Sequence, residues 1–309
     1  MRIAIVFPGQ GTQAPGMGRP WVDHPSFGLV DRLGDALGEP LRHLLLDADA
    51  EELGRTRAAQ LSVLVTSLVA WDALRGAFPE IAPVAFAGHS LGQVTALIAA
   101  EVLDAEAGAR FAARRAELTQ AAADAHPGRM AALLGASVEE AEAACAAAPD
   151  ACWLANDNAP GQVVIAGTPD GVEAATARAK ELGVRRVMAL AVGGAFHTPL
   201  MDDARAGLRD ALAGVALRDP TVPVVSNADG SAVRDGDSWR TRLVDHVTTP
   251  VRWRTSMETL RDLGAECFVE VGYGSMIAGL AKRAVADVVV HGLATPDDLA
   301  PVADRLRAD

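Results

Sequence analysis

The chain has 309 residues, half of them hydrophobic, and 28 Lys and Arg stand against 40 Asp and Glu, which gives a net charge of −12. This hydrophobic fraction excludes intrinsic disorder, and the acidic balance excludes the basic surface of a nucleic-acid-binding protein. Three cysteines at unrelated spacings exclude a disulfide framework. Every apolar run is too short to span a bilayer, so we expect a cytoplasmic protein with neither membrane nor nucleic-acid partners.

Short apolar runs alternate with helical patterns along the first 125 residues. A β-branched run that stops at Pro8-Gly9 predicts a buried strand, and apolar residues at helical spacing predict a largely buried helix further on. The next apolar run leads through a tight turn into another helical pattern. The predicted elements are strands over 2–7 and 84–87 and helices over 60–74, 95–103 and 105–123.

The stretch from about 128 to 190 has a different pattern from the rest of the chain. It is expected to form a strand, a helix, a hairpin around Pro160-Gly161, a second helix and a last strand. This β-α-β-β-α-β order is typical of a ferredoxin-like unit. We therefore predict a small ferredoxin-like subdomain over 126–191, inserted into a large α/β-hydrolase-like subdomain made of 1–125 and 192–309.

After the insertion, strands and helices alternate again. Such alternation favours an α/β core with a mostly parallel sheet. The predicted elements are helices over 199–213, 237–246 and 254–263, strands over 221–227 and 266–272, and a strand followed by a helix from about 288.

The segment 88–92 reads Gly-His-Ser-Leu-Gly and fits the G-x-S-x-G pattern of a nucleophile elbow. Side chains at the two glycines would clash in so sharp a turn from strand to helix. Ser90 would lie at the helix N-terminus, where free N–H groups and the helix dipole stabilise negative charge. The alternative is a serine that only caps a helix in an ordinary turn.

A nucleophilic serine needs a base, and the chain has seven histidines. Three lie in polar or turn segments and are expected at the surface: His24, His43 and His126. His89, inside the elbow, is expected to point away from Ser90. The remaining candidates are His197, His246 and His291. The chain order of common α/β-hydrolases favours His291, whereas a glycine-rich loop leading into a helix favours an exposed His197.

Four motifs follow one another at consistent spacing: FPGQGTQ at 7–13, GHSLG at 88–92, NDNAPGQVVIAG at 156–167 and GAFH at 194–197. Together they resemble the malonyl-CoA:acyl carrier protein transacylases, the acyltransferases of fatty-acid and polyketide synthesis. The resemblance covers essentially the whole chain. It implies malonyl transfer from malonyl-CoA to the phosphopantetheine thiol of an acyl carrier protein, through a malonyl-serine and without a cofactor of the enzyme's own.

The resemblance also implies catalytic roles. The family uses a Ser–His dyad, so Ser90 would attack the thioester carbonyl while His197 takes its proton and later returns it to the leaving thiol. A backbone carbonyl in the segment 249–253 would orient the histidine, and Arg252 is the matching position. The main-chain N–H groups of Leu91 and Gln10 would bind the oxyanion.

Three further residues match positions that contact the acyl group. Arg115 matches the arginine that binds the malonyl carboxylate, because a guanidinium donates two parallel hydrogen bonds; its alternative is a solvated helix arginine. Phe196 matches a position at which phenylalanine goes with malonyl and smaller residues go with methylmalonyl. Asn156 matches a residue near the acyl site; its alternative is an asparagine that forms a turn.

Three positions depart from the family pattern. Gln93 replaces a common glutamate after the elbow, Leu61 a common proline after Gln60, and Tyr273 the proline of a Gly-Pro-Gly sequence. None of them belongs to the proposed dyad, so they leave the reaction class unchanged.

Other functions remain open from the sequence. We expect a monomer that serves fatty-acid synthesis. The alternatives are an acyltransferase acting in trans on a polyketide assembly line, an acyl-carrier-protein hydrolase on the same fold, and a non-catalytic docking module. Because the ligands are anionic and the chain is acidic, attraction to them must be local. The basic residues proposed for it are Arg185, Arg186, Arg252, Arg254, Lys282 and Arg283.

Overall fold

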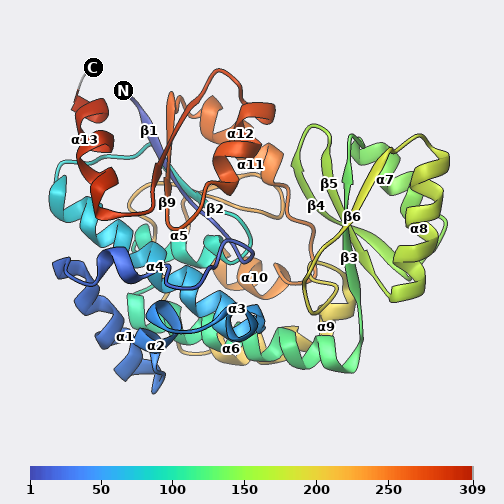
Figure 1. Cartoon of the computed structure of the whole chain (residues 1–309), viewed down its shortest axis with the longest axis horizontal. Coiled ribbons are helices and arrows are strands. Elements are labelled where there is room, and N and C mark those ends of the chain that lie inside the picture. The colour runs from blue at the N-terminus through green and yellow to red at the C-terminus, as the bar shows by residue number, and fades with distance from the viewer. Residues whose placement is uncertain (308–309) are drawn as a thin grey trace.

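A computed structural model describes residues 1–307, which form a large sheet with helices on both faces and a small sheet whose two helices cover one face (Figure 1). The large sheet has six strands in the order β10-β9-β1-β2-β7-β8, and all neighbours are parallel except the hairpin β7–β8. This confirms the predicted mostly parallel α/β core. The strands are β1 (Ile3–Phe7), β2 (Ala85–Gly88), β7 (Val224–Val225), β8 (Ala232–Val233), β9 (Cys267–Val271) and β10 (Val289–Leu293).

Both faces of the large sheet are covered, as the apolar strands require. Alternate residues of β1 enter two different cores: Ile5 and Phe7 face one, Ala4 and Val6 the other. The second core is closed by α11 (Trp253–Asp262) and α12 (Met276–Ala284). The first is closed by α1 (Gly28–Leu37), α2 (Leu41–Leu46), α3 (Ala50–Gly54), α4 (Thr56–Ala77), α5 (Gly92–Ala99), α6 (Ala105–Ala125), α9 (Asp202–Leu212), α10 (Ser238–Asp245) and α13 (Leu299–Arg307).

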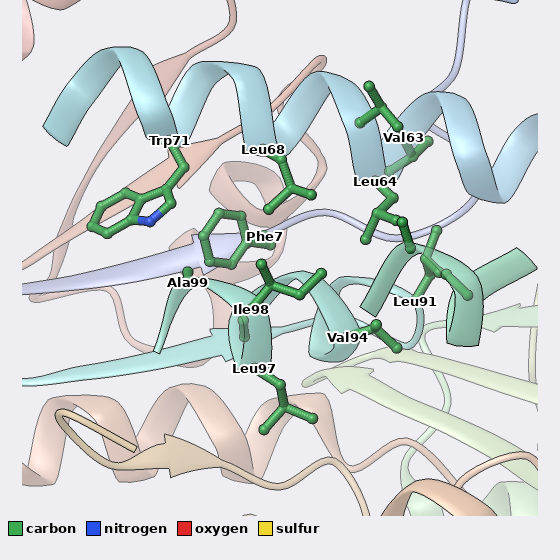
Figure 2. Packing of buried hydrophobic residues seen from close by; sticks show 14 of the residues in the cluster. Phe7, Val63, Leu64, Leu68, Trp71, Leu91, Val94, Leu97, Ile98 and Ala99 are labelled. Carbon is green, nitrogen blue, oxygen red and sulfur yellow. The ribbon is translucent and has the colours of Figure 1, made fainter. Parts of the chain in front are cut away.

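Helix α4 fixes the position of α5, the helix that follows the elbow. Figure 2 shows side chains of α4 directed toward Phe7 of β1 and toward α5. Trp71 packs edge-on against Phe7, with ring centroids 6.4 Å apart. Leu91, the residue after Ser90, is itself fully buried in this core. Burial of a leucine side chain contributes about 1.5–3 kcal/mol, so the elbow is anchored by packing on the side that follows the serine.

The small sheet has the order β4-β5-β3-β6, and all its strands are antiparallel. In the subdomain's own strand numbering this order is 2-3-1-4, which is the predicted ferredoxin-like arrangement. The elements lie within the predicted range of 126–191. They are β3 (Arg129–Leu134), α7 (Val138–Cys145), β4 (Cys152–Ala159), β5 (Gln162–Gly167), α8 (Pro169–Glu181) and β6 (Arg186–Ala189).

Three predicted elements are shorter than expected. Helix α5 ends at Ala99 because Glu101 adopts a left-handed backbone, with φ of 64°. The helix predicted over 199–213 begins with a separate 3₁₀ turn, η3 (Pro199–Met201), before α9. Strand β7 has only two residues, since Pro223 before it lacks an N–H. The other 3₁₀ turns are η1 (Arg19–Trp21), η2 (Pro25–Phe27) and η4 (Pro296–Asp298).

The helices within residues 1–307 include none that is both long and apolar enough to cross a membrane. All three cysteines are buried free thiols.

Candidate active site

The elbow 88–92 has the geometry that its glycines predict. A Cβ on Gly88 would lie 1.9 Å from the carbonyl oxygen of Gly92, and one on Gly92 would lie 2.3 Å from that of Phe7. Any side chain at either position would therefore displace backbone. Between them Ser90 adopts a left-handed conformation, with φ of 51°. Strained backbone of this kind at a non-glycine residue is concentrated at functional sites.

The structure brings His197, and neither other candidate, to the serine hydroxyl. Ser90 Oγ lies 2.8 Å from His197 Nε2, across 107 positions of sequence. His197 Nδ1 donates to the backbone carbonyl of His246 at 2.9 Å. This bond leaves Nε2 free to accept the serine proton. His291 lies on β10 near Arg305, and the ring of His246 contacts Asn227 instead of Ser90.

Two expectations about the histidine were wrong. His197 is only 4% exposed, because η3 and the loop before it pack into the cleft between the sheets. Its orienting carbonyl is that of His246, whereas the carbonyl of Arg252 accepts from the Ser256 N–H in the first turn of α11. A carbonyl at a helix start is committed to the helix, so Arg252 could not take the predicted role.

The predicted oxyanion donors are free to bind a ligand. Within the described residues, the main-chain N–H groups of Gln10 and Leu91 have no hydrogen-bond acceptor. Gln10 follows β1 and lines the cavity at Ser90, and Leu91 follows the serine directly. Two unpaired N–H groups beside a nucleophile form the arrangement that stabilises a tetrahedral oxyanion.

A cavity opens at Ser90 between the two sheets, with walls from both. The large subdomain contributes Gln10, Gln60, His89, Ser90, Arg115, Phe196, His197 and Met276, and the small one contributes Met130, Asn156, Asn158, Val164 and Leu190, with Val192 at the junction. The polar groups are concentrated around the serine, and the apolar ones come mainly from the small sheet and from 190–196. A cavity of this kind suits an acyl chain with one charged end.

Arg115 is buried, so the solvated-arginine alternative is wrong. It is 3% exposed on α6, donates to Gln60 Oε1 at 2.7 Å, and lies 3.3 Å from Ser90 Oγ. Its Nε has no partner, and no charged group among the described side chains offsets its burial, which lowers its pKa to about 10. It remains a cation at neutral pH. An uncompensated buried charge is costly, and an anionic ligand is the natural compensation.

Asn156 and Phe196 both border the cavity. Asn156 lies within β4 and forms a bridge to Val251, so it is a strand residue and not a turn residue. Phe196 directly precedes His197 and packs against both subdomains. His89 turns away from Ser90, as expected, and its Nε2 pairs with Asn158 Oδ1 at 2.8 Å.

The departures from the family pattern are accommodated. Gln93 keeps a hydrogen bond, since its Oε1 accepts from the Asn227 N–H at 2.7 Å. Leu61 is buried in the core of the large subdomain, and Tyr273 packs against that core.

The roles of two buried site residues were not predicted from the sequence. Gln60 is a hydrogen-bond partner of Arg115, and Asn227 is a partner of the elbow. Asn227 lies just after β7, next to β2 in the sheet. The carboxyl ends of neighbouring parallel strands meet at one edge, where ligands bind in open α/β sheets. Asn227 ends the predicted strand 221–227, and this polar position at the end of a strand is the sequence feature that could have indicated a site residue.

The chain matches the acyl transferase domain family over residues 4–302. It belongs to this family. The malonyl CoA-acyl carrier protein transacylase of Haemophilus influenzae is 36% identical over 291 residues, which are 93% of each chain. The Escherichia coli (strain K12) protein of the same name is 36% identical over 308 residues, or 97% of this chain and 98% of that one.

Solved structures share the fold across the whole chain. The acyl-carrier-protein S-malonyltransferase from Burkholderia pseudomallei superposes with a TM-score of 0.94 at 35% identity, covering 98% of this chain and 100% of that one. A malonyl-transacylase solved in complex with a type II polyketide-synthase acyl-carrier protein superposes with a TM-score of 0.94 at 32% identity. The match covers 99% of this chain and 100% of that one.

Electrostatics in this acyl transferase favour a neutral His197. Burial, followed by the nearby charge of Arg115, lowers the pKa of His197 to about 3. Only the neutral imidazole can accept the serine proton, so the base form persists well below the ordinary histidine range.

We expect acylation of Ser90 to show no loss of rate near pH 6.5. Because His197 titrates far below that value, acylation should stay flat from pH 8 down to about pH 5, below which other groups protonate. Rapid-quench measurement of the acyl-enzyme formed from labelled acyl-CoA across this range tests it. A half-maximal rate near pH 6.5 would show that the histidine has its ordinary pKa.

Proposed function

We propose that this protein transfers a malonyl group from malonyl-CoA to the phosphopantetheine thiol of an acyl carrier protein, through malonyl-Ser90. The observation that carries the proposal is the buried, uncompensated Arg115, 3.3 Å from Ser90 Oγ. A guanidinium there offers two donors to the free carboxylate of a diacid thioester. The names of the relatives support the same substrate.

In the first half-reaction, Ser90 Oγ attacks the thioester carbonyl as its proton moves to His197 Nε2. The oxyanion that forms accepts hydrogen bonds from the N–H groups of Gln10 and Leu91. Collapse breaks the carbon–sulfur bond, and the departing thiolate of CoA takes the proton back from Nε2. The His246 carbonyl stabilises the transient imidazolium through Nδ1–H.

The second half-reaction repeats these steps with the phosphopantetheine thiol as the attacking group. His197 Nε2 takes the thiol proton, the sulfur attacks malonyl-Ser90, and the proton returns to Ser90 Oγ. One thioester replaces another, so the exchange is nearly isoenergetic. The main requirement on the cavity is that water be kept from the acyl-serine between the two steps.

Acyl selection is assigned to Arg115, Phe196 and Asn156. Arg115 holds the carboxylate, and Asn156 lines the same cavity from β4. Phe196 borders the cavity next to the base, and we assign to its bulky ring the discrimination against an α-methyl group. One methyl group changes discrimination by only about 1–3 kcal/mol, so malonyl is proposed as preferred over methylmalonyl without absolute exclusion.

The proposed pathway is fatty-acid synthesis, with supply of a polyketide assembly line as the alternative. The proposed working form is a cytoplasmic monomer without a cofactor, since one chain supplies the whole dyad and cavity. Of the basic residues proposed to attract the anionic substrate and carrier, Arg254 is held by Asp157 at 2.8 Å. The others are exposed: Arg185, Arg186, Arg252, Lys282 and Arg283.

The lifetime of the acyl-enzyme separates a transferase from a hydrolase. We expect malonyl-Ser90 to persist for minutes without an acceptor and to discharge within seconds when a phosphopantetheinylated carrier protein is added. Intact-mass spectrometry of the enzyme after a brief exposure to malonyl-CoA measures both rates. Rapid release of malonate without acceptor would make the protein a hydrolase. Repeating the assay with carriers of fatty-acid and polyketide systems decides the pathway.

A further inference from the structure

We propose that Asn227 is a positioning residue that holds both members of the dyad in one closed hydrogen-bonded ring. The proposal rests on Ser90 being the nucleophile and His197 the base, but not on which acyl group is transferred. Its evidence is a set of contacts that Asn227 makes with the elbow, with α5 and with the element that orients His197.

The side-chain amide of Asn227 binds the backbone on both sides of His89. Its Oδ1 accepts from the Ser90 N–H at 2.8 Å, and its Nδ2 donates to the Gly88 carbonyl at 2.9 Å. The amide thus supplies the hydrogen bonds that a neighbouring strand would supply to these two backbone groups if β2 continued. It satisfies one buried and one partly buried backbone group and holds Ser90 in its left-handed conformation.

The main chain of Asn227 is fixed as firmly as its side chain. Its N–H donates to Gln93 Oε1 at 2.7 Å, and its carbonyl accepts from the Arg252 N–H at 2.7 Å. The residue is fully buried. It is therefore held between α5 and the start of α11, so the amide is preorganised and needs no rearrangement when substrate binds.

A second path leads from Asn227 to the base. The ring of His246 lies with Nε2 3.2 Å from Asn227 Oδ1, and its backbone carbonyl accepts from His197 Nδ1. Oδ1 is an acceptor, so His246 donates through Nε2–H. Burial lowers the pKa of His246 and keeps its ring neutral. The hydrogen-bonded circuit from Asn227 through His246 and His197 is completed by the 2.8 Å contact between His197 Nε2 and Ser90 Oγ.

Loss of Asn227 should therefore change the rate constant of acylation and leave substrate binding nearly unchanged. Asn227 does not itself line the cavity, and its contact with the lining is through the Ser90 backbone N–H, not through Arg115. A misplacement of about 1 Å in a catalytic group costs on the order of 10²-fold in rate. We expect kcat of Asn227→Ala to fall by about that factor, with KM for malonyl-CoA within about threefold of wild type.

Asn227→Asp provides a readout that a purely structural role would not give. An ionised carboxylate still accepts a hydrogen bond from the Ser90 N–H, but it has no donor for the Gly88 carbonyl and repels that oxygen. A protonated carboxyl has one donor and one acceptor, like the amide that it replaces. The activity of this variant relative to wild type should rise by about tenfold or more from pH 8 to pH 6, whereas the defect of Asn227→Ala should not depend on pH.

The matched control is Ser226→Ala. Ser226 is also fully buried at the end of β7, but its hydroxyl contacts Arg242 and the Ala228 N–H and not the elbow. Its kcat should stay within about twofold of wild type. Thermal melts of all variants report the fold, and labelling of Ser90 by a fluorophosphonate reports the dyad without malonyl-CoA. Labelling should slow in Asn227→Ala even if malonyl proves not to be the substrate.

Three results would overturn the proposal. The first is an Asn227→Ala variant that keeps wild-type kcat and wild-type labelling of Ser90. The others are a folded Ser226→Ala variant that loses as much kcat as Asn227→Ala, and an Asn227→Ala variant in which only KM changes. If Asn227→Ala does not fold, the aspartate variant decides alone, and an activity ratio to wild type that does not change with pH refutes the positioning role.

Discussion

Ser90→Ala is expected to form no malonyl-enzyme and to lose nearly all transfer. The hydroxyl is the only proposed nucleophile, and its 2.8 Å contact with His197 is what activates it. Removal of the nucleophile of a covalent mechanism lowers kcat on the order of 10⁴–10⁶-fold, with the residual rate due to the remaining site. Intact-mass spectrometry after incubation with malonyl-CoA should show no added malonyl group. A quenched-flow transfer assay gives the residual rate.

Ser62→Ala is the matched control for this experiment. The Ser62 hydroxyl is buried on α4 and donates to the carbonyl of Ala59, away from the cavity. It should load malonyl normally. If Ser90→Ala loads malonyl at the control's rate, the group is carried elsewhere and the mechanism fails.

Arg115→Ala is expected to change which acyl group the enzyme transfers. Without the guanidinium, a malonyl carboxylate would be buried with no cationic partner, so kcat/KM for malonyl-CoA should fall on the order of 10²–10³-fold. Acetyl-CoA has no carboxylate and loses no ion pair. Its kcat/KM should fall far less, or rise because the buried charge is gone. Parallel assays with the two thioesters give the ratio that tests the role.

The same variant carries a second readout and has a close control. The charge of Arg115 contributes to the low pKa of His197, so its removal should raise that pKa and move the acid limb of acylation to higher pH. Arg114→Ala changes the neighbouring arginine, which is exposed and paired with Glu117 at 2.9 Å. It should leave both selectivity and pH profile unchanged. An equal loss of malonyl and acetyl transfer in Arg115→Ala would remove the carboxylate role.

Local steric requirements explain why parts of this protein were predictable from sequence. The turn at 88–92 needs glycine at both ends because backbone atoms of Gly92 and Phe7 occupy the space of any side chain there. Hydrophobic periodicity over a dozen residues likewise predicted α4, and other local patterns predicted α6, a polar stretch that carries arginines, and the order of elements in the small subdomain. Each of these features depends on neighbours close in the chain, so a short window contains the information.

The tertiary structure alone decided which distant groups meet at Ser90. The sequence left three histidines open, and only the tertiary structure places His197 there, held by the backbone carbonyls of His246 and Val247 just after α10. The burial of Arg115 and the contacts of Asn227 were likewise decided by packing. Side chains more than a hundred positions apart meet because parallel strands β1, β2 and β7 end at one edge of the sheet, and no local pattern encodes that adjacency.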